Sequence, residues 1–311
     1  MLRLPALAVL LGTALYSLGA APCAQTSQIA PGDTIRKLAQ SNFGDAAFWP
    51  AIVLATNSRS SEGFRSVGDL DNIAGLSKLC IPDKDEAQHW RSSYEKYMAA
   101  IQRTALPEPS DVAPKLVEFP PGRPVIVVSW IRHDQIGSFQ DPSRQWRKKA
   151  PTEIWVTVEP YLQKFCSDFV ATNGSDLQQL TERLEQRLGL PPVSGNNEFV
   201  KIRLNHPTSR VIFRPCMDPS PNTANCLVGP PPKTIDAKHQ QWIFHQYYAS
   251  FGKARLESFP WTALGYTFDW AVDENGVFQR IGESEFVIRE GAPIEVVGAV
   301  ATGDYCRATS R

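Results

Sequence analysis

Charge of one sign is what this sequence most clearly lacks. Lysine plus arginine and aspartate plus glutamate each number 32, so the formal net charge is zero. Proteins that bind nucleic acid concentrate basic residues on the binding face and commonly carry a basic excess. We therefore do not expect a nucleic acid, or a polyanion in general, as the partner.

The short motifs of metal and nucleophile chemistry are also absent. The chain contains no His-Glu-x-x-His, no His-x-His pair and no Gly-x-Ser-x-Gly elbow. His239 and His245 are six residues apart, so on one helix they would face different directions. We expect neither a metal nor a cofactor.

Long hydrophobic runs are missing except at the N-terminus. Met1–Arg3 is a short basic start, Leu4–Leu18 is an apolar run, and small residues follow. This layout is typical of a secretory signal peptide, because the run is too short for a comfortable membrane span. We expect residues 1–24 to direct export to the periplasm or the cell exterior, with cleavage after Ala20 or Ala24. An uncleaved membrane anchor is the alternative.

Export would place the six cysteines in an oxidising compartment. Cys216 and Cys226 bracket a turn-rich loop, and we expect them to pair with each other. Cys166 with Cys306 is the next pairing that we expect. If Cys23 is removed with the signal peptide, five cysteines remain, and one of them stays unpaired or pairs elsewhere.

One stretch near the N-terminus has a distinctive order of elements. It reads as a turn with a short helix, a second turn, a second short helix and a closing strand, over Pro31–Gln40, Asn42–Asp45, Phe48–Asn57 and Leu79–Pro82. This order resembles the lysin motif (LysM), a small domain that binds N-acetylglucosamine glycans, over residues 27–83. The resemblance implies a βααβ fold for this part of the chain.

The residues of this stretch are compatible with such a fold. Asp33 is expected to cap the first helix, because its carboxylate can accept hydrogen bonds from free amides of the first turn. Ile35, Leu38 and Ala39 have helical spacing and would form the inward face of that helix. Gly44 suits the left-handed conformation that ends many helices.

The resemblance also implies a ligand, which would be peptidoglycan or a related N-acetylglucosamine glycan. In lysin motifs the turn after the first strand and the turn after the second helix form a shallow groove, whose backbone amides and carbonyls contact the N-acetyl groups. Matched onto this sequence, the groove residues are Gly32, Asp33, Thr34 and Ile35 in the first wall and Thr56 and Asn57 in the second.

The second wall is where the sequence departs from the motif. Ser58–Ser77, between the second helix and the closing strand, is longer than the family usually allows. This insertion would extend the groove, cover it, or leave the fold without its binding function. In the last case the module would only pack against its neighbour.

Three further regions are expected after the motif. Trp90, Tyr94 and neighbouring aromatic residues lie on one face of a helix over residues 84–103, which would dock the small module onto the rest of the chain. Closely spaced prolines over residues 104–124 predict a stiff, extended linker. Residues 125–311 mix strands and helices without a βαβ rhythm, and this predicts a larger α+β domain with a mainly antiparallel sheet. The strands expected there are 125–128, 154–158, 199–204, 210–213, 285–288 and 294–299, and the helices are 160–169, 175–188 and 234–251.

The C-terminal region has one dense group of aromatic and acidic residues. Phe259–Trp270 is rich in aromatic rings and includes Asp269, and Glu283 and Glu285 follow shortly after it. Two carboxylates about 5–10 Å apart would suit glycoside hydrolysis, so a hydrolase acting on wall glycan is the alternative function. A hydrophobic hairpin corner with solvated acidic residues explains the same pattern, and we favour it. A domain that docks another protein is a third interpretation.

Overall fold

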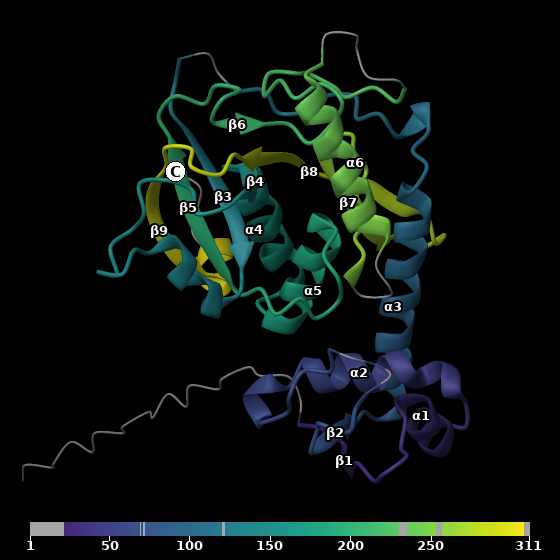
Figure 1. Cartoon of the computed structure of the whole chain (residues 1–311). Helices are drawn as coiled ribbons and strands as arrows, with labels where there is room; N and C mark the ends of the chain where they lie inside the picture. Colours follow the sequence, from purple (N-terminus) through teal and green to yellow (C-terminus); the bar gives the residue numbers. More distant parts are fainter. Residues whose placement is uncertain are drawn as a thin grey trace, which may run out of the picture.

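The computed structural model describes residues 22–68, 70, 72–119, 122–229, 235–252 and 257–307. Most of the expected signal peptide and the expected helix start at Thr234 therefore lie outside the described residues. Within them, no helix is both long and apolar enough to cross a membrane. The chain folds into a small N-terminal module and a larger domain, which α3 (Lys84–Thr104) connects (Figure 1).

The small module has the βααβ order expected from the sequence. Its elements are β1 (Gln25–Gln28), α1 (Ile35–Phe43), α2 (Trp49–Asn57) and β2 (Lys78–Ile81), with single 3₁₀ turns at Ala46–Phe48 and Ser60–Glu62. β1 and β2 form a two-stranded antiparallel sheet. The inward faces of both helices and β2 share one apolar core, with members Ile35, Leu38, Ala39, Trp49, Ile52, Val53, Val67, Ile73, Leu79 and Ile81.

The caps of α1 differ from the sequence prediction at one end. Thr34, not Asp33, caps the helix, since the Thr34 hydroxyl accepts a hydrogen bond from the N–H of Lys37. The carboxylate of Asp33 instead accepts from the N–H of Ala30 at 2.7 Å and so closes the preceding turn. At the other end Gly44 has the expected left-handed conformation, with φ of 79°.

Helix α3 joins the two parts by contacts along its length, as its aromatic face predicts. Asp83 caps it by accepting a hydrogen bond from the N–H of Glu86. Near its start, Trp90 packs into an apolar cluster of the small module. Further along, the Ser93 hydroxyl donates to Glu182 of the large domain, and the Tyr97 hydroxyl donates to the backbone there. The helix is therefore part of both cores.

The segment 104–124, expected as a stiff, extended linker, packs against the large domain through its described residues. Leu116 and Phe119 are buried in apolar clusters of that domain. Asp111, in the short 3₁₀ turn Pro109–Asp111, is buried and forms an ion pair with the half-buried Arg103. Because apolar side chains alternate with the prolines, the segment gains more by covering the sheet than by remaining solvated.

The large domain is built on one antiparallel sheet, which confirms the α+β class. Its strands run in the order β6-β8-β4-β3-β5-β9, with β7 paired to β8, and every pairing is antiparallel. The strands are β3 (Val125–Ile131), β4 (Ile154–Val158), β5 (Glu198–Leu204), β6 (Ile212–Phe213), β7 (Tyr266–Val272), β8 (Phe278–Ile288) and β9 (Glu295–Ala301). The helices are α4 (Tyr161–Asn173), α5 (Leu177–Leu188), α6 (Ala237–Phe251) and α7 (Thr302–Arg307), and a 3₁₀ segment covers His133–Phe139.

The two faces of this sheet are covered differently. Loops that include Phe119 and Phe139 cover one face and complete the largest apolar cluster. On the other face, α4, α5 and α7 pack over β3 and β5, while α6 lies over the far end of the sheet (Figure 1). The space between these two groups of helices is where the candidate site lies.

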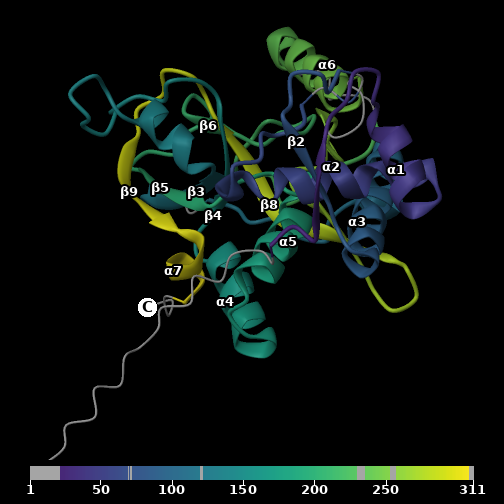
Figure 2. The same ribbon diagram turned by 90° about the horizontal axis from the view of Figure 1, so that it is seen from below.

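The described residues form three disulfides, two of which join segments that are distant in the sequence. Cys216–Cys226 and Cys166–Cys306 are the pairs expected from the sequence, and the second ties α7 to α4 (Figure 2). Cys23 pairs with Cys80 on β2, so no described cysteine is free while Cys23 is retained. The expected odd cysteine arises only if cleavage removes Cys23. Disulfides of this kind are typical of proteins that mature outside the reducing cytosol.

Candidate functional site

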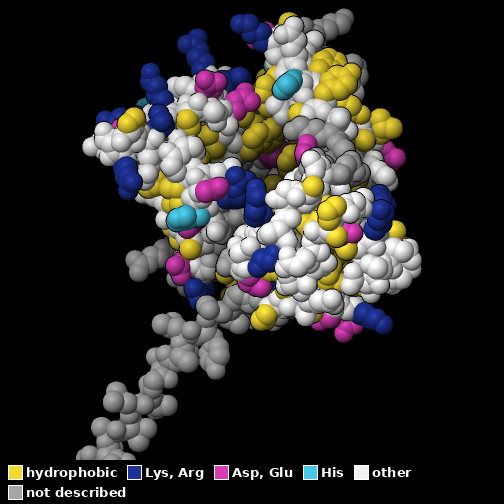
Figure 3. All heavy atoms as spheres, turned by 60° about the horizontal axis from the view of Figure 1, so that its bottom comes forward, with side chains coloured by type: hydrophobic (Ala, Val, Ile, Leu, Met, Phe, Trp, Pro, Cys, Tyr) yellow, Lys and Arg dark blue, Asp and Glu magenta, His cyan; other side chains and the backbone are white. Residues whose placement is uncertain are grey.

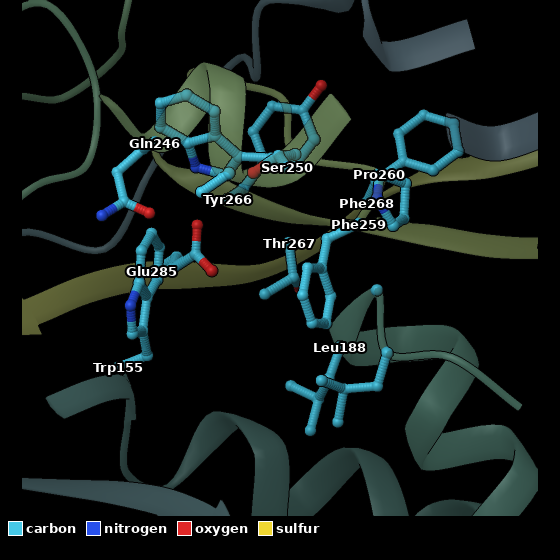
Figure 4. Close-up of a pocket in the computed structure, with 14 residues that line it drawn as sticks. Trp155, Leu188, Gln246, Ser250, Phe259, Pro260, Tyr266, Thr267, Phe268 and Glu285 are labelled. Atoms are coloured by element: carbon cyan, nitrogen blue, oxygen red, sulfur yellow. The ribbon is translucent and has the colours of Figure 1, made fainter. Parts of the chain in front are cut away.

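A cavity of about 350 Å³ opens on the helical face of the sheet, between α6 and the C-terminal end of α5. Its wall is mostly apolar, and its members are Trp155, Leu188, Gly189, Leu190, Gln246, Ala249, Ser250, Phe259, Pro260, Trp261, Tyr266, Thr267, Phe268 and Glu285. The carboxyl group of Glu285 points into the space, with Trp155 and Gln246 on one side and Phe259 and Leu188 on the other (Figure 4). The space-filling view shows the surface hollowed beside α6 (Figure 3).

Strand alternation places the floor of this cavity. Side chains at every second position of a strand share a face. In β4 the residues Ile154, Val156 and Val158 belong to the core on the opposite face, so Trp155 and Thr157 point to the cavity side. Thr157 is paired with Glu285 across β4 and β8, which brings these two polar side chains together.

Glu285 has an unusual electrostatic environment. Its Oε2 atom is buried and has no hydrogen-bond partner in the part of the chain that the structure describes. Burial in these apolar surroundings raises the pKa of Glu285 to about 8. The carboxyl group therefore carries a proton at neutral pH.

Two other polar atoms near this carboxyl group are equally unsatisfied. The indole Nε1 of Trp261, in the wall of the cavity, and the Oγ1 of Thr157 are buried without a partner among the described residues. Thr157 lines a second cavity of about 120 Å³, which shares Trp155 and Glu285 with the first. Buried polar atoms normally have hydrogen bonds, so three unpaired ones around joined cavities point to a binding site.

Asp269 and Glu283 do not belong to this site. Asp269 is fully buried and accepts two hydrogen bonds from Arg183 on α5, at 2.7 and 3.0 Å. Glu283 accepts one from Arg187 of the same helix at 2.8 Å. Both carboxylates are thus held in ion pairs that fix α5 to the sheet, and the expectation of solvated acids at a hairpin corner is wrong. The pairing of Asp269 or Glu283 with Glu285 in glycoside hydrolysis has no support in this geometry.

Trp155 and Gln246 are cavity residues that the sequence pattern did not single out. For Trp155 the signal is the alternation of β4, which separates it from the core residues. For Gln246, within the expected helix 234–251, no local signal exists. Its side chain faces the cavity only because α6 crosses the sheet at this point (Figure 4).

The residues expected to form a glycan groove divide into two groups. Gly32 and Thr34 are exposed, and Asp33 is half-buried. Their turn lies on the side of the small module that faces away from the large domain (Figure 1). Gly32 has φ of +86°, a conformation that favours glycine, and a Cβ placed there would meet no neighbour. The first wall is therefore open to a ligand.

The other expected groove residues have side chains that are already engaged. Ile35 is in the core of the small module, so only its backbone could contact a ligand. Thr56 is fully buried, and its hydroxyl accepts a hydrogen bond from the N–H of Cys80. Asn57 binds the backbone of Val67 through its amide oxygen at 2.7 Å. At Thr56 and Asn57, as at Ile35, only backbone groups could therefore contact a ligand, and whether these two residues form a second wall stays a prediction.

The insertion Ser58–Ser77 supplies the partner of Asn57 and is itself packed into the module. Its residues Val67 and Ile73 are buried in the core of the small module, and Phe64 packs in the adjoining cluster. The buried guanidinium of Arg59 forms an ion pair with Glu86 on α3. The insertion is thus an integral part of the module, and it occupies the side on which a second wall was expected.

No protein-family model, curated protein or solved structure matches this chain. The functional argument therefore depends on the two sites themselves. Within the described ranges there is no cluster of three or more His, Cys, Asp or Glu side chains that could hold a metal ion. The chemistry at hand is hydrogen bonding by an exposed turn in one site and an apolar, aromatic cavity with one neutral carboxyl group in the other.

Proposed function

We propose that this protein is exported to the periplasm or the cell exterior and binds peptidoglycan, or a related N-acetylglucosamine glycan, through its small N-terminal module. The proposal carries over the resemblance to the lysin motif, and the observation that carries it is the βααβ order with an antiparallel β1–β2 pair. The three disulfides support the export part of the proposal.

The glycan would contact the turn between β1 and α1. The N–H of Ile35 begins α1, so it lies outside the ladder of helical hydrogen bonds and is suited to an acetamide oxygen. Gly32 allows a sugar ring to approach the backbone closely, because no side chain stands in the way. Since the side chains of Thr56 and Asn57 are engaged, we expect backbone groups and Thr34 to provide the contacts.

A single exposed turn buries little of a ligand, and its affinity should therefore be modest. The position of the turn does, however, make it accessible to a long glycan. It faces away from the large domain, so a long glycan strand could pass it without meeting the sheet domain (Figure 1). The large domain would then be held at the cell wall by the module.

Co-sedimentation of residues 21–311 with purified sacculi tests the proposal. We expect the wild-type protein in the pellet, and Gly32→Trp in the supernatant, because the indole would fill the groove. Gly44→Trp is the matched control: Gly44 has a similar φ of 79° and open space around it, but lies at the opposite end of α1. Both variants should lose comparable stability, whereas only the first should lose binding.

Two outcomes contradict the proposal. If the wild-type protein stays in solution, the module has no affinity for the wall. If both glycine variants lose binding to the same extent, the loss reflects destabilisation and the turn is not the binding site. Assaying the supernatants for released muropeptides at the same time tests the hydrolase alternative, which requires sugar release by the wild-type protein.

A further inference from the structure

The carboxyl group of Glu285, which points into the cavity, has no positively charged partner among the described residues. Among the described residues that line the cavity there is neither a lysine nor an arginine. This contrasts with Asp269 and Glu283, which both face guanidinium groups of α5. A buried carboxyl group without a counter-ion is costly to ionise, and such groups in proteins are commonly completed by a ligand.

Aromatic rings surround this carboxyl group. Trp155 and Trp261 line the cavity, and Trp242 lies between them, with ring centroids at 5.9 Å from the first and 6.3 Å from the second. Tyr266 adds another ring to the wall. The faces of aromatic rings carry partial negative charge and attract cations, most strongly in sites shielded from water.

We propose that the cavity binds a small organic cation, an ammonium group with apolar substituents, with Glu285 as its counter-ion and the indoles of Trp155 and Trp261 as its ring contacts. The unpaired N–H of Trp261 can donate a hydrogen bond, so the ligand should also carry an oxygen acceptor near the ammonium group. An anionic ligand is disfavoured, since the lining residues offer it no cation. A volume of about 350 Å³ lies within the usual range of small-molecule sites.

Binding of such a cation must displace a proton. With its pKa raised to about 8, Glu285 is neutral at about pH 7, so the cation enters as the carboxyl proton leaves to solvent, and the charge of the site is unchanged. Among the described residues that line the two cavities, Tyr266 is the one titratable side chain besides Glu285. Glu185 on α5, whose pKa burial raises to about 8, and His239 on α6, whose pKa burial lowers, line neither cavity. Tyr266 on β7 has a pKa raised to about 12, and Arg187 on α5 is paired with Glu283. β4 and α6 contribute Trp155, Thr157 and Gln246.

Isothermal titration calorimetry with choline tests this proposal, using residues 21–311. The comparison ligand is neohexanol, in which a carbon atom replaces the nitrogen of choline, so that shape is kept and charge is lost. We expect choline to bind about tenfold or more tightly than neohexanol. Titrations at about pH 7 in two buffers of different ionisation enthalpy should show release of close to one proton per choline bound.

Two glutamate variants distinguish the effect of the carboxyl group in the cavity from the effect of a negative charge elsewhere on the surface. Glu285→Gln keeps the shape of the side chain and should weaken choline binding about tenfold or more, with neohexanol little changed. Glu290→Gln, at an exposed position just beyond β8, removes a carboxylate from the surface and should change neither choline binding nor neohexanol binding.

The proposal is overturned if choline and neohexanol bind equally, if no proton is released, or if neither ligand binds. It is also overturned if Glu285→Gln binds choline as the wild type does. Competition by free N-acetylglucosamine would make the cavity a site for neutral sugars instead. Gly32→Trp should leave choline binding intact, so failure here and failure of the glycan proposal can be told apart.

Discussion

The pKa of Glu285 makes the stability of the protein depend on pH in a defined direction. The folded state keeps the Glu285 proton up to about pH 8, whereas the unfolded chain loses it near the ordinary value of 4.5. Between these values the unfolded state binds fewer protons, so the free energy of unfolding falls as pH rises, by at most about 1.4 kcal/mol per pH unit. We expect Glu285→Gln to be about 4 kcal/mol more stable than wild type at about pH 7.5 and nearly equal to it at about pH 4.

Urea unfolding of both proteins across this pH range measures the difference. Glu185 is also buried, and its pKa is likewise raised to about 8, but it contributes the same slope to both proteins and cancels. A Glu285→Gln protein that is less stable than wild type at about pH 7.5 would show that Glu285 is ionised and stabilised by a partner.

Single residues were predicted well where a local rule decided them. The caps at Asp83 and Gly44 follow from neighbouring residues alone, and both are present. The side-chain partners of Thr56 and Asn57 could not be predicted from neighbouring residues. Their hydroxyl and amide groups are engaged by Cys80 and Val67, which are 24 and 10 residues away in the chain.

Among the elements, α5 depends on two buried carboxylates for its position on the sheet. Asp269→Asn would leave the guanidinium of Arg183 next to a neutral amide in a mostly buried site. We expect this change to lower the free energy of unfolding by about 2–3 kcal/mol, because breaking a buried ion pair leaves a charge without a partner. Glu295→Gln, whose ion pair with Arg203 is exposed, should cost less than about 1 kcal/mol.

Chemical denaturation of both variants decides between this structural role and the catalytic role of Asp269. A stable Asp269→Asn protein that has lost a glycan-cleaving activity present in the wild type would contradict the structural role. Loss of stability with no such activity in either protein would agree with it.

The elements themselves were predictable to different degrees. The β-branched run expected as a strand over 154–158 has the bounds of β4, and the helix expected over 175–188, before Gly189, corresponds to α5. No strand was expected over β7, and its partner β8 was expected only over 285–288. Whether a segment forms a strand depends on the strand it pairs with, so local sequence patterns predict the bounds of such strands poorly.

For the whole molecule, the sequence indicated the two parts and the helix between them, but not how closely they are joined. Val193 of the large domain packs in the same apolar cluster as Leu54 and Trp90. The segment 104–124 covers part of the sheet. These contacts depend on the relative position of two folded units, which no single segment of sequence specifies.

The Cys23–Cys80 disulfide gives a prediction about processing of the whole chain. Cleavage after Ala24 would remove Cys23 and leave Cys80 as a free thiol, whereas cleavage after Ala20 retains the bond. The bond closes a loop with a sequence separation of 57 residues, which the chain-entropy account values at about 4 kcal/mol. We therefore expect the exported protein to begin at residue 21, with a mass equal to residues 21–311 less six hydrogen atoms for its three disulfides. Intact-mass spectrometry before and after alkylation without reductant measures both. A protein that begins at residue 25 and takes up one alkyl group would contradict the predicted cleavage, and its small module should unfold at lower denaturant concentration than that of a protein beginning at residue 21.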